Sequence, residues 1–309
     1  MLALLCGGQG LLSPAMFDLT SGQPEAEPVF AAAQALLGRD PRVLVRERDE
    51  PLLHANRASQ ILSVSAALAL HACIAAALPP AFAVTGYSVG EMAAWSIAGA
   101  WSAETALQLT DQRARAMDEA GSGDGQLGYV RGLARQAVEA LASRHGCAIA
   151  IINPDGLFVV GGVRADVTAL CHEAESAGAA RAALLDVHVA SHTPRLSQAV
   201  VVLREALEAS AAADPKPGRL LLAGGDGSRV FKAAHAVPQL AAQVAKTIDW
   251  ATTLEALGEF GVDRMLDLGP GHALADMART ALPHVRSYAA DGFHSLAGLR
   301  DWLATAGRG

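Results

Sequence analysis

Two kinds of hydrophobic pattern alternate along the chain and predict an α/β fold. Short runs that are apolar at nearly every position, and that are followed by glycine, are typical of strands buried in a parallel sheet. They alternate with longer segments whose apolar residues recur at helical spacing. We expect strands at residues 3–6, 82–85, 219–223 and 264–268. We expect helices at residues 28–50 with a break at Asp40 and Pro41, and at 59–78, 91–100, 103–120, 197–212, 238–257 and 273–282.

The middle of the chain has a different order of predicted strands and helices, which indicates a small inserted unit. The tract GSGDG at residues 121–125 interrupts the helical pattern and marks a candidate boundary. Strands and helices then follow in the order β-α-β-β-α-β of a ferredoxin-like unit, at residues 127–133, 135–144, 147–152, 157–160, 165–177 and 181–187. We therefore predict a large α/β-hydrolase-like domain with a mostly parallel sheet, formed by residues 1–120 and 190–309, and a ferredoxin-like subdomain of residues 121–189.

One apolar stretch has the length of a membrane span. Between residues 58 and 90 the only ionisable side chain is His71. The stretch is rich in alanine and is broken by Pro79 and Pro80, whereas a spanning helix needs about 20 strongly apolar residues in a row. We expect a buried helix, a turn and a buried strand here.

Composition and charge narrow the class of protein. Hydrophobic residues make up 51% of the chain and charged residues 18%, which favours a large buried core. The net charge of -7 argues against nucleic acid and anionic membranes as partners, since both select basic surfaces. The four cysteines form no CxxC pair, so neither a zinc site nor a disulfide framework is indicated. We expect a cytoplasmic protein with reduced thiols, without a metal or a permanently bound cofactor.

The strongest chemical signal is the pentapeptide GYSVG at residues 86–90. It follows a buried strand and opens a helix, which is the setting of a nucleophile elbow. Small flanking residues allow a tight turn that exposes the Ser88 hydroxyl. The N-terminus of the helix then favours a developing negative charge. A glycine-rich turn with a capping serine is the alternative.

An acyl-enzyme also needs a second oxyanion donor and a base. The loop GGQG at residues 7–10 ends the first strand, so a backbone N–H at Gln9 is a candidate donor. Among ten histidines, three remain as candidates for the base: His188, His192 and His272. His192 lies where the inserted unit returns to the large domain, and His272 follows a strand in a glycine-rich turn. The pattern alone does not separate these two histidines.

Arg113 is the third candidate. Leu109, Arg113 and Met117 share one face of a predicted helix, and no acid lies three or four residues before the arginine. An arginine on an apolar stripe is costly unless an anion pairs with it. That anion is either an internal acid or the carboxylate of a substrate.

These motifs occur together in a known family. In chain order they are GGQG at 7–10, SQILSVSAALAL at 59–70, GYSVGE at 86–91, Arg113 with Met117, NP at 153–154, SH at 191–192, Gln243 seven residues before Trp250, and DLGPG at 267–271. The set resembles the malonyl-CoA:acyl-carrier-protein transacylases and the acyltransferase domains of fatty acid and polyketide synthases. The resemblance spans nearly the whole chain, and the combination is specific although each motif alone is not.

The resemblance implies a catalytic role for five residues. Ser88 would be the nucleophile, and His192 the general base and acid. The backbone N–H groups of Gln9 and Val89 would form the oxyanion hole. The main-chain carbonyl of Gln243 would orient His192, in place of the acid of a triad.

The resemblance also implies an acyl pocket, with two departures from the usual pattern. Arg113 would bind the free carboxylate of malonyl, and Gln60 and Asn153 would line the pocket. Tyr87 stands where the family usually has histidine, and Gly7 where it usually has proline. Both positions line the site, so they are expected to tune the choice of acyl group or thiol. The Tyr-Ser pair looks like that of the transacylase (epsilon) subunit of bacterial malonate decarboxylase.

The sequence therefore predicts an enzyme that moves malonyl from malonyl-CoA to the thiol of an acyl carrier protein through a malonyl-serine intermediate. The carrier would hold an arm of the phosphopantetheine type, which in malonate decarboxylase is phosphoribosyl-dephospho-CoA. Three alternatives stay open. They are a malonyl transacylase of fatty acid or polyketide synthesis, a serine hydrolase that uses Ser88 with His272, and a non-catalytic subunit that docks a carrier.

Overall fold

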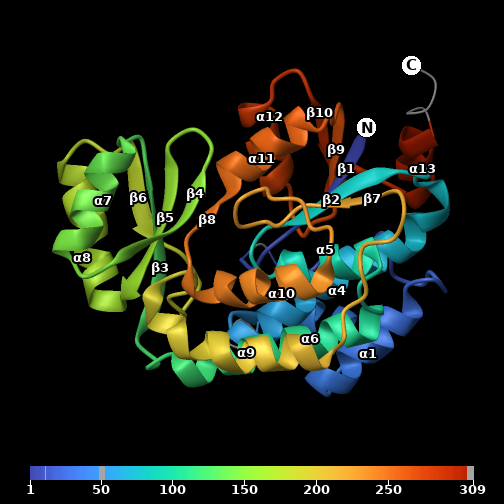
Figure 1. Ribbon diagram of the computed structural model, residues 1–309, viewed down its shortest axis with the longest axis horizontal. Helices are drawn as coiled ribbons and strands as arrows, with labels where there is room; N and C mark the ends of the chain where they lie inside the picture. Colours follow the sequence, from blue (N-terminus) through green and yellow to red (C-terminus); the bar gives the residue numbers. More distant parts are fainter. Residues whose placement is uncertain (11, 49–52, 305–309) are drawn as a thin grey trace.

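The computed structural model describes residues 1–10, 12–48 and 53–304, and it contains two β-sheets with helices packed around them (Figure 1). The larger sheet has the strand order β10-β9-β1-β2-β7, and every neighbouring pair is parallel. The predicted parallel sheet is therefore confirmed, although the sequence pattern did not indicate β10. Its strands are β1 (Leu2–Cys6), β2 (Phe82–Gly86), β7 (Arg219–Leu221), β9 (Arg264–Asp267) and β10 (Arg286–Ala289).

Ten α-helices and four short 3-10 helices in the described part of the chain accompany this sheet. The helices are α1 (Glu27–Leu37), α2 (Pro41–Glu47), α4 (Asn56–Ile74), α5 (Gly90–Ala98), α6 (Ala103–Ala120), α9 (Ser197–Ala209), α10 (Ala233–Ala242), α11 (Trp250–Glu259), α12 (Ala273–Ala281) and α13 (Leu296–Ala304). The 3-10 helices are η1 (Ala75–Ala77), η2 (Pro194–Leu196), η3 (Gln243–Ala245) and η4 (Ala290–Gly292). The predicted break between α1 and α2 is confirmed, because the Asp40 side chain caps α2 by accepting from the Arg42 N–H at 2.8 Å. Residues 49 and 50 of that prediction lie outside the described residues.

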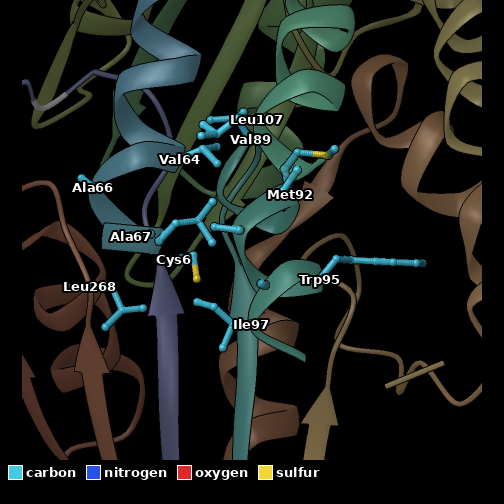
Figure 2. Packing of buried hydrophobic residues seen from close by; sticks show 14 of the residues in the cluster. Cys6, Val64, Ala66, Ala67, Val89, Met92, Trp95, Ile97, Leu107 and Leu268 are labelled. Carbon is cyan, nitrogen blue, oxygen red and sulfur yellow. The ribbon is translucent and has the colours of Figure 1, made fainter. Parts of the chain in front are cut away.

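Helices cover both faces of the large sheet. Alternate residues of a strand point to opposite faces, so each strand contributes to the core on both sides. Leu4 and Cys6 of β1 belong to a core cluster shared with α4, α5 and α6. Leu5 belongs to a second cluster, shared with α11 and α12. Figure 2 shows Cys6 in the first cluster together with Ala67 of α4 and Ile97 of α5. The central strand β1 is therefore apolar at all five positions, because both of its faces are buried.

The apolar helix α4 lies inside the protein. Residues Asn56–Ala77 are long and apolar enough to cross a membrane, with a mean hydropathy of 1.7, but 72% of the most apolar window is buried within the protein. Length and composition are weak evidence here, because the core helix of a soluble protein meets the same criteria. The predicted succession of buried helix, turn and buried strand is confirmed by α4, η1 and β2.

The smaller sheet has the strand order β6-β3-β5-β4-β8. Its first four strands pair antiparallel in the order of a ferredoxin-like unit, with α7 and α8 packed on one face (Figure 1). The fifth strand, β8, comes from the C-terminal part of the chain and pairs parallel with β4, so it ties the small sheet to the rest of the molecule. The elements are β3 (Gly125–Arg131), α7 (Arg135–Arg144), β4 (Ala148–Asn153), β5 (Leu157–Val163), α8 (Arg164–Ser176), β6 (Arg181–Leu184) and β8 (Ile248–Asp249).

The prediction of one continuous helix over residues 238–257 is wrong. The segment contains the end of α10, the turn η3, the strand β8 and most of α11. Asp249 starts α11 as its N-cap, since its carboxylate accepts from the Thr252 N–H at 3.0 Å. The apolar spacing continues on both sides of the break, which is why the pattern conceals it. The break places the backbone carbonyl of Gln243 in the short turn η3.

Candidate active site

The turn between β2 and α5 presents Ser88 at the carboxyl edge of the large sheet. Its backbone is left-handed, with φ at +55°, a conformation that residues other than glycine rarely adopt. The two glycines of the motif are required by space. A Cβ atom at Gly86 would lie 2.2 Å from the Glu91 backbone nitrogen, and one at Gly90 would lie 2.1 Å from the Cys6 carbonyl oxygen. The strand, turn and helix can therefore pack this closely only with glycine at both positions.

The glycine loop at residues 7–10 runs beside this turn. Because β1 and β2 are parallel neighbours, the segments that follow them leave the sheet at the same edge. A Cβ at Gly8 would lie 3.6 Å from the Cβ of Ser88. Among the described residues, the backbone N–H groups of Gln9 and Val89 have no hydrogen-bond acceptor. Both predicted oxyanion donors are thus left unpaired by the fold.

Ser88 and His192 form a hydrogen-bonded dyad. The Ser88 Oγ lies 2.7 Å from the Nε2 of His192, and the Nδ1 of His192 lies 2.7 Å from the carbonyl oxygen of Gln243. Because a carbonyl only accepts, Nδ1 carries the proton and Nε2 is left to accept from the serine hydroxyl. The backbone of His192 is also left-handed, at φ +61°, and its N–H donates to the Val244 carbonyl at 2.8 Å.

The environment keeps the His192 imidazole neutral. The side chain is buried, and this burial lowers the pKa of His192 from 6.5 to about 3. The positive charge of Arg113 acts in the same direction, whereas the hydrogen bond to Gln243 opposes it. A neutral imidazole with a free Nε2 lone pair is the form that a general base requires.

The structure distinguishes the histidines that the sequence pattern left open. His272 is exposed at the start of α12, and its Nδ1 pairs with Asp276 at 2.6 Å on the surface. His188 contacts the side chain of Gln126, at 3.2 Å. Only His192 contacts Ser88 among the described histidines, so a hydrolase dyad of Ser88 with His272 is not formed.

Arg113 is buried within the protein without a direct ion pair among the described residues. Its Nη1 donates to the Gln60 Oε1 at 2.5 Å and contacts the Met117 sulfur at 3.2 Å. Its Nη2 is buried and has no hydrogen-bond partner among the residues that the structure describes. Burial lowers the pKa of Arg113 to about 10, and the charge of Glu91 opposes this shift, so the guanidinium stays protonated at neutral pH. An unpartnered nitrogen on a buried cation indicates a position for an anionic ligand.

Asn56 orients this pocket, and the sequence analysis did not identify it. The Gln60 amide nitrogen donates to the Asn56 Oδ1 at 2.7 Å, which turns the Gln60 oxygen toward Arg113. The Asn56 nitrogen in turn donates to the Asp118 carboxylate at 2.8 Å. The signal for Asn56 was its position four residues before Gln60, on the same face of α4.

Tyr87 and Asn153 line a cavity of about 350 Å³ between the two sheets. Gln9 also lines it, so the cavity reaches the oxyanion loop. The Tyr87 ring packs edge-on against Trp250 at 5.3 Å, and burial raises the pKa of its phenol, opposed by a hydrogen bond from Asn153. The Oδ1 of Asn153 is buried and accepts no hydrogen bond from residues 1–10, 12–48 or 53–304. Tyr87 therefore fixes one wall of the cavity and leaves the Asn153 oxygen available to a ligand.

A serine in a strand–turn–helix elbow, paired with a neutral histidine and placed near two unpaired backbone N–H groups, defines an enzyme that transfers acyl groups through a serine ester. The comparison with known families agrees with this class. The chain belongs to the family of acyl transferase domains, whose family model matches residues 26–249.

Individual relatives match most of the chain to different extents. The malonyl CoA-acyl carrier protein transacylase of Haemophilus influenzae is 25% identical over 97% of this chain and 98% of its own length. The polyketide biosynthesis protein ThaF of Burkholderia thailandensis is 33% identical over 66% of this chain, and that match spans only 17% of the relative.

Solved structures share the complete fold. An acyl-carrier-protein S-malonyltransferase from Burkholderia pseudomallei superposes with a TM-score of 0.89 at 25% identity, covering 98% of this chain and 99% of the other. The malonyl transacylase PlMCAT, solved with the type II polyketide synthase carrier protein AntF, gives a TM-score of 0.89 at 26% identity with the same coverage.

Proposed function

We propose that this acyltransferase is a malonyl-CoA:acyl-carrier-protein transacylase, which moves malonyl from coenzyme A to the thiol of a carrier protein through malonyl-Ser88. The observation that carries the proposal is the buried Arg113. Its Nη2 has no hydrogen-bond partner in the described part of the chain, and its charge acts on His192. A malonyl thioester ends in a free carboxylate, which is the anion that this site lacks. The malonyl transacylases among the relatives support the same substrate.

Acylation follows from the geometry of the dyad. The Nε2 of His192 takes the proton of Ser88 as Oγ attacks the thioester carbon of malonyl-CoA. The carbonyl oxygen becomes an oxyanion, which accepts hydrogen bonds from the backbone N–H groups of Gln9 and Val89. The carbon–sulfur bond then breaks, and protonated His192 returns its proton to the departing coenzyme A thiolate. The product is an ester of malonyl with Ser88.

Transfer to the carrier runs the same steps in reverse. His192 removes the proton from the thiol of the carrier's arm, and the sulfur attacks the malonyl ester. The intermediate collapses, the carbon–oxygen bond breaks, and His192 protonates the Ser88 oxygen. Water must be kept from the ester during the exchange of coenzyme A for carrier, because hydrolysis would waste the acyl group.

Arg113 gives the enzyme its acyl selectivity. A malonyl carboxylate satisfies both the charge and the orphaned Nη2, with the bidentate geometry that a guanidinium favours. An acetyl group leaves the cation unpaired in a buried site. A pocket built for a polar group rejects a ligand without that group more strongly than an apolar pocket rejects an extra methylene.

We infer further that the carrier is the dedicated subunit of malonate decarboxylase, in the cytoplasm, with a phosphoribosyl-dephospho-CoA arm. The support for this subfamily is the Tyr87–Ser88 pair, in which tyrosine stands in place of the usual histidine. Gly7, in place of the usual proline, is the second departure from the family pattern. Gly7 contacts the neighbouring loop closely, since its N–H donates to the Gly269 carbonyl at 3.3 Å. The test measures the rate of malonyl transfer to the malonate decarboxylase carrier and to a carrier of fatty acid synthesis. Faster transfer to the malonate decarboxylase carrier is the expected result. Faster transfer to the fatty acid carrier would contradict the subfamily.

The proposed reaction is tested by incubation with labelled malonyl-CoA and measurement of the intact mass. The wild type is expected to gain one malonyl group, located on the peptide that contains Ser88. Ser88→Ala should gain none. A malonyl adduct on that variant, or release of free malonate as the main product in the presence of carrier, would contradict the proposal.

A further inference from the structure

Glu91 is a buried acid, three residues after Ser88, that the mechanism above does not use. It lies in the first turn of α5 and is 2% exposed. We propose that Glu91 is a positioning residue for His192: its carboxylate holds the side chain of Gln243, whose backbone carbonyl holds the imidazole. The inference rests on the proposed acyl transfer at Ser88, because it concerns the base of that reaction.

The Glu91 carboxylate accepts hydrogen bonds from three separate parts of the fold. The backbone N–H of Gly224 donates to Oε2 at 3.0 Å, and the side-chain amide of Gln243 donates to the same oxygen. The indole N–H of Trp95 donates to Oε1 at 3.4 Å. None of these three partners is a cation. The carboxylate therefore serves as a junction of neutral donors, one of which leads directly to the dyad.

Gln243 makes that connection through two different groups. Its side-chain amide bonds to Glu91, and its backbone carbonyl accepts from the Nδ1 of His192 at 2.7 Å. Gln243 is the first residue of η3, and its carbonyl accepts both from the Lys246 N–H at 3.3 Å and from His192, because a carbonyl oxygen can accept two hydrogen bonds. In the described part of the chain its side chain has no hydrogen bond other than that to Glu91. Loss of Glu91 thus frees the residue that fixes the imidazole.

Glu91 acts on His192 by position and not by its charge. The influences on the pKa of His192 are burial, Arg113 and the Gln243 carbonyl, and Glu91 is not among them. Burial raises the pKa of Glu91 to about 7, opposed by the hydrogen bonds from Gly224 and Trp95. Asp226 adds to the rise, and Arg113 opposes it. A protonated carboxyl still offers a carbonyl oxygen, so the bond from Gln243 persists on both sides of this pKa.

The test measures how fast Ser88 reacts with a fluorophosphonate probe, which reports activation of the serine without requiring malonyl. Glu91→Leu and Gln243→Ala should each lower the saturating rate constant by about 10–100-fold, because a small misplacement of the base is costly. The probe concentration at half saturation should stay within about twofold of wild type, since neither Glu91 nor Gln243 lines the cavity bordered by Gln9 and Tyr87. The single-turnover rate of malonylation should fall in parallel.

A double variant and two controls separate this role from a structural one. The double variant Glu91→Leu with Gln243→Ala should label Ser88 no more slowly than the slower single variant. Each substitution removes the same hydrogen bond, the one between the two side chains. Glu91→Gln keeps an acceptor oxygen and should recover most of the rate. Trp95→Phe removes the donor that leads away from His192 and should react within about twofold of wild type. Thermal unfolding establishes that each variant is folded.

Three results would overturn the inference. They are multiplicative losses in the double variant, a Trp95→Phe rate as low as that of Glu91→Leu, and a lower melting temperature of Glu91→Leu with an unchanged rate. A wild type that reacts normally with the fluorophosphonate but acquires no malonyl would contradict the proposed function instead. The labelling rates would still test the role of Glu91.

Discussion

The protonation of His192 depends on Arg113, a residue of the acyl pocket and not of the dyad. The guanidinium disfavours a second positive charge nearby, so it adds to the effect of burial and lowers the pKa of the imidazole. The base is therefore neutral over a wide pH range before substrate binds. A malonyl carboxylate on Arg113 would offset that charge and raise the pKa of His192 in the complex. Bound malonyl would thus strengthen the base that activates Ser88.

This coupling predicts the pH dependence of Ser88 reactivity. With the pKa of His192 near 3, labelling of the wild type by a fluorophosphonate should be nearly independent of pH between about 5 and about 8. Arg113→Gln removes the positive charge and should move the acid limb to higher pH, toward the ordinary histidine value of 6.5. The measurement is the labelling rate across this range, with circular dichroism as the check on folding. An acid limb that stays in place, or moves to lower pH, would contradict the coupling.

Gly7 carries a second prediction at this scale. A Cβ there would lie 2.5 Å from the Gly269 carbonyl oxygen, so Gly7→Ala must shift the loop that supplies the Gln9 N–H. Loss of one oxyanion donor typically lowers kcat by about 10²–10³-fold. We expect a loss of this size with little change in KM for malonyl-CoA. Gly292→Ala is the matched control, because its Cβ would meet no atom within 4 Å. Equal kinetics for the two variants would show that the loop tolerates the shift.

Individual residues could be predicted from the sequence where chemistry and spacing combine. Ser88 is placed by the strand–turn–helix context, and Arg113 stands out because a cation on an apolar stripe needs an explanation. Asn56 could not be recognised as a pocket residue, since its role depends on which way the Gln60 amide points. The choice between His192 and His272 required either the family resemblance or the folded geometry.

At the scale of elements, the decisive feature is the break between α10 and α11. Hydrophobic spacing continues through it, so the pattern predicted a single helix, and the interruption appears only in the structure. The interruption lets Gln243 present its carbonyl to His192 and lets β8 join the small sheet. In a continuous α-helix that carbonyl would accept from the N–H four residues later, whereas here it accepts from the Lys246 N–H of η3 and from His192. The break that the sequence pattern did not predict therefore provides the carbonyl that orients His192 toward Ser88.

The start of α11 gives a prediction about stability. Asp249→Ala removes the N-cap, and such a loss typically costs about 0.5–2 kcal/mol. Asp249→Asn should retain most of the stability, because asparagine is also a good N-cap. Urea unfolding of both variants measures the difference. Identical free energies of unfolding for Asp249→Ala and the wild type would mean that β8 pairing alone fixes the start of the helix.

At the scale of the whole molecule, the active site is assembled from both sheets. The large sheet supplies Ser88 and the oxyanion loop, and β4 of the small sheet supplies Asn153 beside Tyr87. The element order predicted that two such units exist, because each follows its own local pattern. It did not indicate that β8 crosses from one unit to the other, since a two-residue strand carries almost no pattern. The arrangement of the units is set by such long-range contacts.

The central claim is that Arg113 selects a thioester with a free carboxylate, and one set of kinetics tests it most directly. A hydrogen bond to a charged group is worth about 1.5–3 kcal/mol, so Arg113→Ala should lower kcat/KM for malonyl-CoA by at least about 10–100-fold. Acetyl-CoA has no such carboxylate, so its kcat/KM should be unchanged or improved. Arg113→Lys should recover only part of the malonyl activity, because an ammonium lacks the bidentate fork.

Arg115→Ala is the matched control, since Arg115 lies on the same helix with its side chain 58% exposed and paired with Asp111. We expect that variant to keep the wild-type preference for malonyl over acetyl. The measurement is kcat/KM for both thioesters on the wild type and the three variants. A selective loss of malonyl activity in Arg113→Ala is the predicted result. An equal loss for malonyl and acetyl would show that Arg113 only supports the fold, and it would contradict the assignment of the malonyl site.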